Sequence, residues 1–351
     1  MEITNQIQKA GDHSQQIQAG TVIIQNGISE ERARAIYLEM SKEAIKECTN
    51  EASAIANERI VKFENVLVPK IQQIESDFKS FSDPGFQVLL KKAQLTAMCS
   101  ARQDDYKLLS ELLVHRIKNK TNIKKKASIT RAVEIIDQID DDALNALTVF
   151  HAINSFIPVS GNIEFGLQVL DTLYSKLNLE ELPNDSLWID NLSILGAINI
   201  IPFAHSKKYE DYLVDELNGY VCVGIRKDSQ EYVEAVINLI SAQISPDVLV
   251  DNILLSGYMR VSLSSKNNIA KSLNDAQKSC INNILNSYIK NPELETKVKQ
   301  KFYELFYSFE SIKKAFEWKN SIKQNIALTS IGRVIAHTNA KRIDNSLPDL
   351  D

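Results

Sequence analysis

Apolar residues recur at intervals of three or four positions along most of this chain, which is the pattern of amphipathic helices. The longest such stretch, residues 29–67, contains neither glycine nor proline and predicts one helix of about 55 Å. Ser29 is its expected N-cap, and Pro69 is expected to break or kink the helix that follows. The apolar stripe is narrow and rich in alanine, so we expect close packing against another helix, from the same subunit or from another. The stripe consists of Ala33, Ile36, Met40, Ala44, Cys48, Ala52 and Ile55.

Residues 83–156 have the pattern of a helical bundle. Four helices are expected, over residues 86–101, 104–118, 128–139 and 141–156. The residues expected to cap the last three of them are Asp104 or Asp105, Ser128, and Asp140 or Asp141.

Residues 157–343 predict an α-rich domain with a few short strands. Strand composition is found in residues 219–226 and 257–263, whereas Asn274, Pro292 and Thr329 are expected at helix starts. Two segments, 186–200 and 328–342, resemble the helix and strand elements of winged-helix domains. Residues 344–351 are polar and are expected to form a flexible tail.

The first 28 residues form a distinct tail of short alternating and β-prone runs punctuated by Gly11, Gly20 and Gly27. Two short strands alone in water are marginal, so the tail is either disordered, packed on its own chain, or paired with copies from other subunits. The apolar run and the glycines favour pairing between subunits. The expected oligomerisation contacts are Ile17, Val22 and Ile24 in the tail and Ile36, Met40, Ala44 and Cys48 in the long helix.

These patterns predict a mainly α-helical protein with a short N-terminal β tail, a long helix, a helical bundle, and a C-terminal α-rich domain with short winged-helix-like strands. The expected divisions are 1–28 (tail), 29–82 (helical stalk), 83–156 (bundle), 157–343 (C-terminal domain) and 344–351 (flexible tail).

Composition and charge narrow the class of protein. Of the 351 residues, 44% are hydrophobic and 24% charged, which is ordinary for a folded globular chain. Four scattered cysteines, no signal-peptide pattern and no run of about 18 apolar residues indicate a cytoplasmic protein without a membrane span. The net charge of -5 gives no electrostatic support to general coating of nucleic acid.

One local stretch is strongly basic, residues 118–126 (KNKTNIKKK). We expect a solvated loop there, because short charge runs usually are loops, and the alternative is a patch that contacts phosphates. No aromatic residue is interleaved for base stacking. The possible nucleic-acid contacts are Lys118, Lys120, Lys124, Lys125 and Lys126.

The sequence contains no recognisable catalytic constellation. The five histidines show no metal-ligand spacing, and the glycine-rich phosphate motifs and the nucleophile elbow are missing. His115 is expected to be an amphipathic boundary residue rather than a ligand. The acidic run at 137–142 could supply nuclease carboxylates, but its place between two helices favours capping. We therefore expect no cofactor and no metal, and more readily a binding protein than an enzyme.

Several motifs resemble an uncharacterised family of bacterial proteins. They are the opening GDHSQQIQAG, which fits a G-[ND]-x-S-x-x-I-Q-A-G pattern, the DPxFQ stretch from Asp83, the Ala101-Arg102-x-Asp104 stretch, and the pattern LTxxGxxIAxxNxxR from Leu328 to Arg342. The resemblance covers most of residues 11–150 and 328–342. It implies an N-terminal tail followed by a long helix, an association with bacterial anti-phage defence genes, and no assigned catalytic residue.

Three functions follow from these observations. The first is a non-enzymatic homo-oligomeric scaffold or sensor in anti-phage, abortive-infection-type defence, whose partners are other copies of itself and possibly a defence protein or phage component. The second is a nucleic-acid-binding regulator that uses the winged-helix-like segments and the lysines. The third is an unrecognised metal-dependent nuclease built on carboxylates at 137–142 or 210–216.

Overall fold

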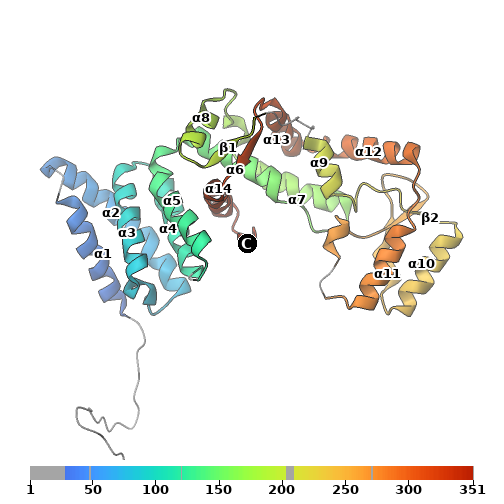
Figure 1. Cartoon of the computed structure of the whole chain (residues 1–351), viewed down its shortest axis with the longest axis horizontal. Coiled ribbons are helices and arrows are strands. Elements are labelled where there is room, and N and C mark those ends of the chain that lie inside the picture. The colour runs from blue at the N-terminus through green and yellow to red at the C-terminus, as the bar shows by residue number, and fades with distance from the viewer. Residues whose placement is uncertain (1–27, 47–48, 120, 203–208, 270–271, 351) are drawn as a thin grey trace, which may run out of the picture.

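The computed structural model describes residues 28–350 apart from 47–48, 120, 203–208 and 270–271. Its described part contains fourteen α-helices and five short strands, which confirms the predicted mainly helical class. Figure 1 shows the N-terminal helices gathered at one end of the molecule and a small module of helices and strands at the other. Helices from the middle and the C-terminal part of the chain lie between them.

The first two helices form an antiparallel pair rather than one rod. Helix α1 (Glu30–Ile45) begins after Ser29, whose hydroxyl accepts a hydrogen bond from the backbone N–H of Arg32, as predicted. Helix α2 (Asn50–Ile74) returns alongside it, since the Tyr37 hydroxyl donates to the Ile60 carbonyl at 3.0 Å and Arg34 pairs with Glu64 at 2.8 Å. The predicted single helix over 29–67 is therefore wrong.

Helix α2 also continues through Pro69, where a break or a kink was predicted, so the break is absent. A proline removes only one backbone donor, and buried Leu67, Val68 and Ile71 hold the helix against its neighbours on both sides of it. Because α2 packs against α3 (Pro84–Cys99) and α4 (Gln103–Lys118), residues 29–82 are part of the bundle and not a separate stalk.

The remaining bundle helices follow the predicted order. Helix α5 (Ile123–Ile135) and helix α6 (Asp141–Ser155) complete the series, and Asp140 caps α6 through the N–H of Ala143 at 2.7 Å. Two predicted caps are wrong. The carboxylates at 104 and 105 lie in the first turn of α4, and Ser128 is buried inside α5, which begins earlier because Asn122 caps it.

Six later helices extend the hydrophobic core of this bundle. They are α7 (Ile163–Ser175), α8 (Leu187–Ile194), α9 (Tyr209–Glu216), α12 (Pro292–Phe306), α13 (Glu310–Ser321) and α14 (Ser330–Ile343). Most of their buried residues share one hydrophobic core with helices α1–α6. Helix α14 is capped by Thr329, as predicted, and packs against α4, α5 and α6. The final helix of the chain thus fills a position in the N-terminal bundle (Figure 1).

The two winged-helix-like segments meet in one antiparallel ribbon. Strand β1 (Ile198–Ile200) pairs with β5 (Ile326–Leu328), with Ile198 opposite Leu328. Helix α14, which follows β5, is buried at every position from Val334 to Ala340. A recognition helix needs an exposed face to enter a DNA groove, so α14 cannot act as one.

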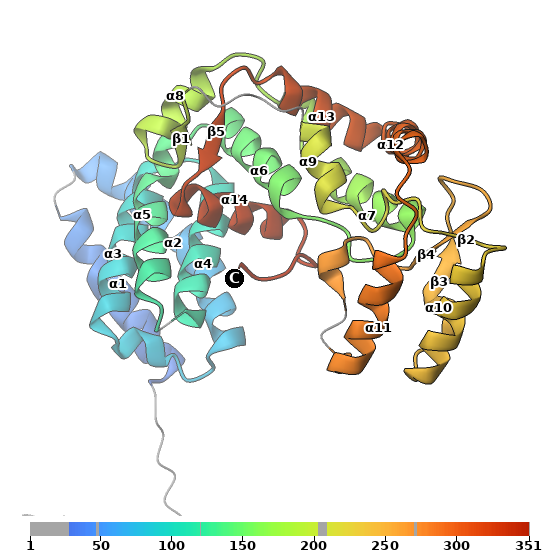
Figure 2. The same ribbon diagram turned by 45° about the vertical axis from the view of Figure 1, so that its right-hand side comes forward.

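A small module lies apart from the bundle (Figure 2). Its antiparallel sheet has the order β2 (Ile225–Arg226), β4 (Tyr258–Val261), β3 (Leu249–Asp251), and α10 (Gln230–Ser241) and α11 (Asp275–Asn286) cover it around a hydrophobic core of its own. Arg260 fastens the module to the body, because its buried guanidinium donates to the carbonyls of Gly161 at 2.5 Å and Gly219 at 3.3 Å.

Candidate functional site

The motif residues behind the family resemblance mostly hold the bundle together. Asn339 on α14 donates to the Thr148 hydroxyl of α6 at 2.9 Å. Arg342 donates to the Asn339 side chain and pairs with Asp104 of α4 at 3.1 Å. The Ala101-Arg102-x-Asp104 stretch and the Leu328–Arg342 pattern, more than 200 residues apart, therefore meet in space. Their polar side chains join α4, α6 and α14.

Gly332 also allows α14 to pack closely, because it has no side chain. A Cβ atom at this position would lie 2.0 Å from the carbonyl oxygen of Ala197, just before strand β1. Only glycine lets the first turn of α14 approach that backbone so closely. These motif residues thus have structural roles, and other polar groups of the molecule are the candidates for function.

The lysine-rich stretch is helical over much of its length. Helix α4 ends at Lys118 and α5 begins at Ile123, so Lys124, Lys125 and Lys126 lie in the first turn of α5 and not in the predicted solvated loop. Cations at a helix N-terminus oppose the helix dipole, and each costs about 0.3–1 kcal/mol. The lysines therefore do not stabilise α5. They add to the positive potential of its exposed amides.

Helix α14 brings further cations to the same end of the bundle. A hollow of about 500 Å³ is lined by Lys124 and Lys125 from α5 and by Arg333 from α14, with the Ser128 and Ser330 hydroxyls 2.9 Å apart at its wall. A smaller hollow of about 50 Å³ adjoins it between α4 and α14, where Lys118 and Lys341 face each other. We call the surface formed by Lys118, Lys124, Lys125, Arg333 and Lys341 the cationic crevice.

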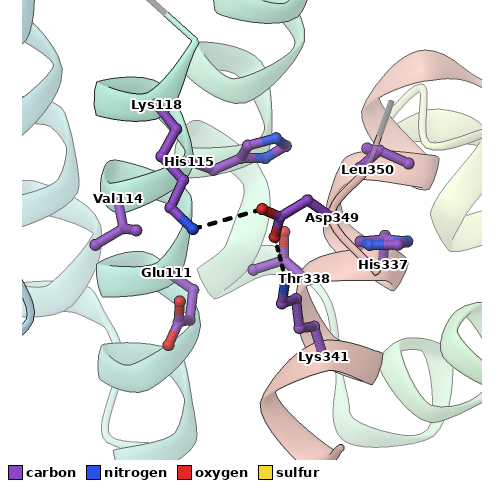
Figure 3. Close-up of a pocket in the computed structure, with 9 residues that line it drawn as sticks. All are labelled: Glu111, Val114, His115, Lys118, His337, Thr338, Lys341, Asp349 and Leu350. Atoms are coloured by element: carbon purple, nitrogen blue, oxygen red, sulfur yellow. Dashed lines mark hydrogen bonds and ion pairs between the residues drawn. The ribbon is translucent and has the colours of Figure 1, made fainter. Parts of the chain in front are cut away.

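The chain's own residues 344–350 lie against this crevice, and Asp349 and Leu350 form part of the walls of its hollows. The Asp349 carboxylate is paired with Lys341 and lies 3.7 Å from the Lys118 ammonium group, so it reaches between α14 and α4 (Figure 3). Lys125 donates to the Leu350 carbonyl at 3.2 Å, while Leu347 and Leu350 pack against the core. Residues 344–350 are thus held down at several points, where a flexible tail was predicted.

A line of buried hydrogen bonds ends at the same segment. His337 Nε2 lies 2.9 Å from the Pro348 carbonyl, which can only accept, so His337 Nδ1 is left to accept from His151 Nε2 at 3.1 Å. His151 Nδ1 then accepts from the Ser155 hydroxyl, also at 3.1 Å. These directions of donation hold for two rings that each carry one proton.

Burial keeps His151 and His115 neutral well below pH 7. It lowers the pKa of His151 to about 3, and His337 and Arg333 add smaller repulsions in the same direction. Burial, followed by repulsion from Lys125, lowers the pKa of His115 to about 4. The positive charge of the crevice therefore comes from lysine and arginine.

Sequence reasoning found only part of this site. Lys118, Lys124 and Lys125 were candidates and lie in it, whereas Lys126 faces a different cavity and Lys120 lies outside the described residues. Arg333, His337 and Lys341 were missed, because nothing local shows that α14 returns to α4 and α5. His151 and His337 are 186 residues apart.

The predicted oligomerisation residues are only partly described. Ile36 and Met40 are half-buried and pack against the chain's own core, and Ala44 lies within α1. Cys48 and the tail residues Ile17, Val22 and Ile24 lie outside the described residues. Their contacts with other subunits stay a prediction.

The carboxylates considered for a nuclease have other partners. Asp140 caps α6, Asp141 pairs with Arg102 at 2.8 Å, and Asp211 pairs with Lys299 at 2.6 Å. Among the residues that the structure describes, no cluster of three or more His, Cys, Asp or Glu side chains could hold a metal ion. Within that same part of the chain, every helix is too short or too polar to cross a membrane.

Comparison with known proteins gives a family but no activity. No curated protein and no solved structure matches this chain. A family model does match, and it spans residues 27–350, which include the bundle, the small module and the 344–350 segment. The chain therefore belongs to this uncharacterised protein family.

Proposed function

We propose that the protein is a non-enzymatic sensor whose cationic crevice binds an acidic peptide segment of a partner protein. In the resting chain, residues 344–350 occupy the crevice in place of that partner. The observation that carries the proposal is this self-occupancy, with Asp349 between Lys118 and Lys341. A partner segment must displace the chain's own residues. Binding of the partner therefore releases residues 344–350 from the crevice, and this release is the signal.

The bound segment indicates the chemistry of the partner. Residues 344–350 place a carboxylate against the crevice lysines, backbone carbonyls against Lys125 and His337, and two leucine side chains against the core, and another acidic peptide can supply all of these groups. The residues that line the two hollows include no Phe, Tyr or Trp on which a nucleic-acid base could stack. A peptide is therefore favoured over single-stranded nucleic acid.

Displacement of the segment is expected to be easy. Asp349 has a side chain that is 65% exposed, and exposed ion pairs contribute at most about 1 kcal/mol each. The segment nevertheless competes at a high effective concentration because it is tethered to α14. Weakening its docking should therefore strengthen the binding of an external peptide.

Fluorescence anisotropy with a labelled peptide of the sequence IDNSLPDL, residues 343–350, tests this mechanism. We expect Asp349→Ala in the full chain to tighten peptide binding by about tenfold, and Lys341→Glu to abolish it. Lys297→Glu, an exposed lysine on α12, is the matched control and should leave it unchanged. Equal affinities for the wild type and Asp349→Ala would contradict self-occupancy.

The same measurement with a labelled DNA strand of the same net charge distinguishes the peptide-binding function from the second candidate, a nucleic-acid-binding regulator. If DNA binds, loses affinity in the Lys124→Glu and Lys125→Glu variants, and the peptide does not bind, a nucleic-acid-binding regulator replaces our proposal. The slope of the logarithm of that affinity against the logarithm of the salt concentration would give the number of phosphates that the protein contacts.

The proposal also includes assembly and a biological setting. Homo-oligomerisation through residues 1–28 is supported by their β-prone, glycine-bounded sequence, and deletion of these residues should lower the mass measured by light scattering. A role in anti-phage defence is supported by the motif resemblance. Plaque counts on cells expressing the wild type or Lys341→Glu test it: protection by the wild type alone is expected, and none by either would contradict it.

A further inference from the structure

A second cavity lies beside the cationic crevice and has a different lining. It has a volume of about 390 Å³ and is bounded by the short 3₁₀ turn η1 (Lys79–Ser82), the first turn of α3, the end of α4 and the start of α5. Lys79, Arg116 and Lys126 contribute to its wall. None of these cations lines the crevice that residues 344–350 occupy.

Arg116 is buried without a close counterion. The residue is only 8% exposed, and the nearest acid in the described part of the chain is Asp83, whose Oδ2 lies 3.7 Å from Arg116 Nη2. This separation is beyond hydrogen-bond length. A buried guanidinium carries five N–H donors and is usually satisfied by a bidentate anion. Arg116 thus offers donors that nothing in the described chain accepts.

Ser80 shows the same deficiency. The residue is 5% exposed and lines the cavity, and its hydroxyl oxygen is buried and has no hydrogen-bond partner among the described residues. Rotation of the side chain about χ1 would be needed to turn this hydroxyl toward a ligand in the cavity. Buried hydroxyls are nearly always paired, so an isolated one beside a cavity indicates a missing ligand atom. An oxygen-rich anion in the cavity would accept from both Ser80 and Arg116.

The charge and shape of the lining indicate the class of anion. Three cations and one carboxylate, Asp83, leave a formal charge of about +2, which matches a phosphomonoester dianion. Asp83 is already engaged as the cap of α3, where it accepts from the Phe86 N–H at 3.1 Å. Phe86 and Ile117 supply an apolar wall on which the organic part of a ligand can rest.

From these observations we infer that this cavity binds a small phosphomonoester, with its phosphate held by Arg116, Lys126 and Ser80. The site is separate from the proposed peptide crevice and does not depend on it. Inorganic phosphate should bind weakly, and phenyl phosphate should bind several-fold more tightly because its ring gains the apolar wall.

Isothermal titration of the full chain with phosphate and with phenyl phosphate tests the inference. Ser80→Ala is the most informative variant, because it removes a hydroxyl that has no partner in the empty protein. It should leave the melting temperature unchanged or slightly raised, yet weaken phenyl phosphate binding by about tenfold. Lys126→Gln should weaken it similarly, whereas Lys297→Gln, at an exposed lysine on α12 outside both sites, is the matched control.

Three results would overturn the inference. One is the absence of heat from phenyl phosphate at millimolar concentration with the folded wild type. Another is equal affinity in the wild type, Ser80→Ala and Lys126→Gln, which would mean that the anion binds elsewhere. A matching response to sodium chloride at equal ionic strength would likewise reduce the effect to general screening. Arg116→Gln is less informative than these variants, because Arg116 is buried and its replacement could abolish binding by misfolding the protein.

Discussion

Acidification should destabilise the protein through His151, and the loss can be estimated from its burial. The folded pKa is about 3, against an ordinary value of about 6.5 in the unfolded chain. Below pH 6.5 the His151 side chain is therefore protonated in the unfolded state but stays neutral in the folded state. The free energy of unfolding thus falls as the pH falls. Between pH 7 and pH 5 the expected loss from this one group is about 2 kcal/mol.

Urea denaturation of the wild type and His151→Gln, followed by circular dichroism at both pH values, measures this contribution. Glutamine can still donate to His337 and accept from Ser155, but it does not titrate. The variant should be less stable than the wild type at pH 7 and should lose about 2 kcal/mol less on going to pH 5. His115 and the carboxylates titrate in both proteins, so their effects largely cancel in the comparison.

The reasoning would be refuted if both proteins lost the same free energy of unfolding between pH 7 and pH 5. That result would mean that His151 gains a proton in the folded state at an ordinary pKa. An NMR titration that placed the His151 pKa above about 5 would show this directly.

Three further predictions concern the joints of the fold and can be measured as free energies of unfolding in urea. Gly332→Ala should cost about 2–4 kcal/mol, because its new Cβ would collide with the Ala197 carbonyl, whereas Gly257→Ala, with open space around it, should cost only about 1 kcal/mol for its positive φ. Thr329→Ala should cost about 1 kcal/mol through loss of the α14 cap, and Thr329→Ser should recover most of it. Phe306→Ala should cost about 3–5 kcal/mol, because its ring is fully buried and meets Phe316 edge to face at 4.9 Å.

The sequence predicted the features that depend on a few neighbouring residues and missed those that depend on contacts between distant residues. Ser29, Asp140, Asn274 and Thr329 were recognised as caps because a helix start is fixed by a few neighbouring residues. The division of residues 29–67 into α1 and α2 was missed because no glycine or proline marks the end of α1. The two helices pack with Tyr37 of α1 against Ile60 of α2, and the apolar periodicity of the sequence does not show this contact.

The candidate site also depends on contacts that the sequence does not show. The lysines of residues 118–126 were visible as a charged run, but three of them are helical because α5 begins after Asn122 and not at Ser128. Arg333, Lys341 and Asp349 join them only because α14 inserts between α4, α5 and α6. The unpaired groups of the second cavity, Arg116 and Ser80, could be recognised only once their surroundings were known.

The insertion of α14 has a consequence for synthesis on the ribosome. Helix α6 leaves the exit tunnel about 175 residues before α14 does, so the earlier helices are made with one wall of their core still missing. At translation rates of roughly 5–20 residues per second, that gap lasts about 10–35 s. During this interval the nascent chain exposes apolar surface that only its last helix can cover, which makes it a natural client for chaperones that bind emerging polypeptides.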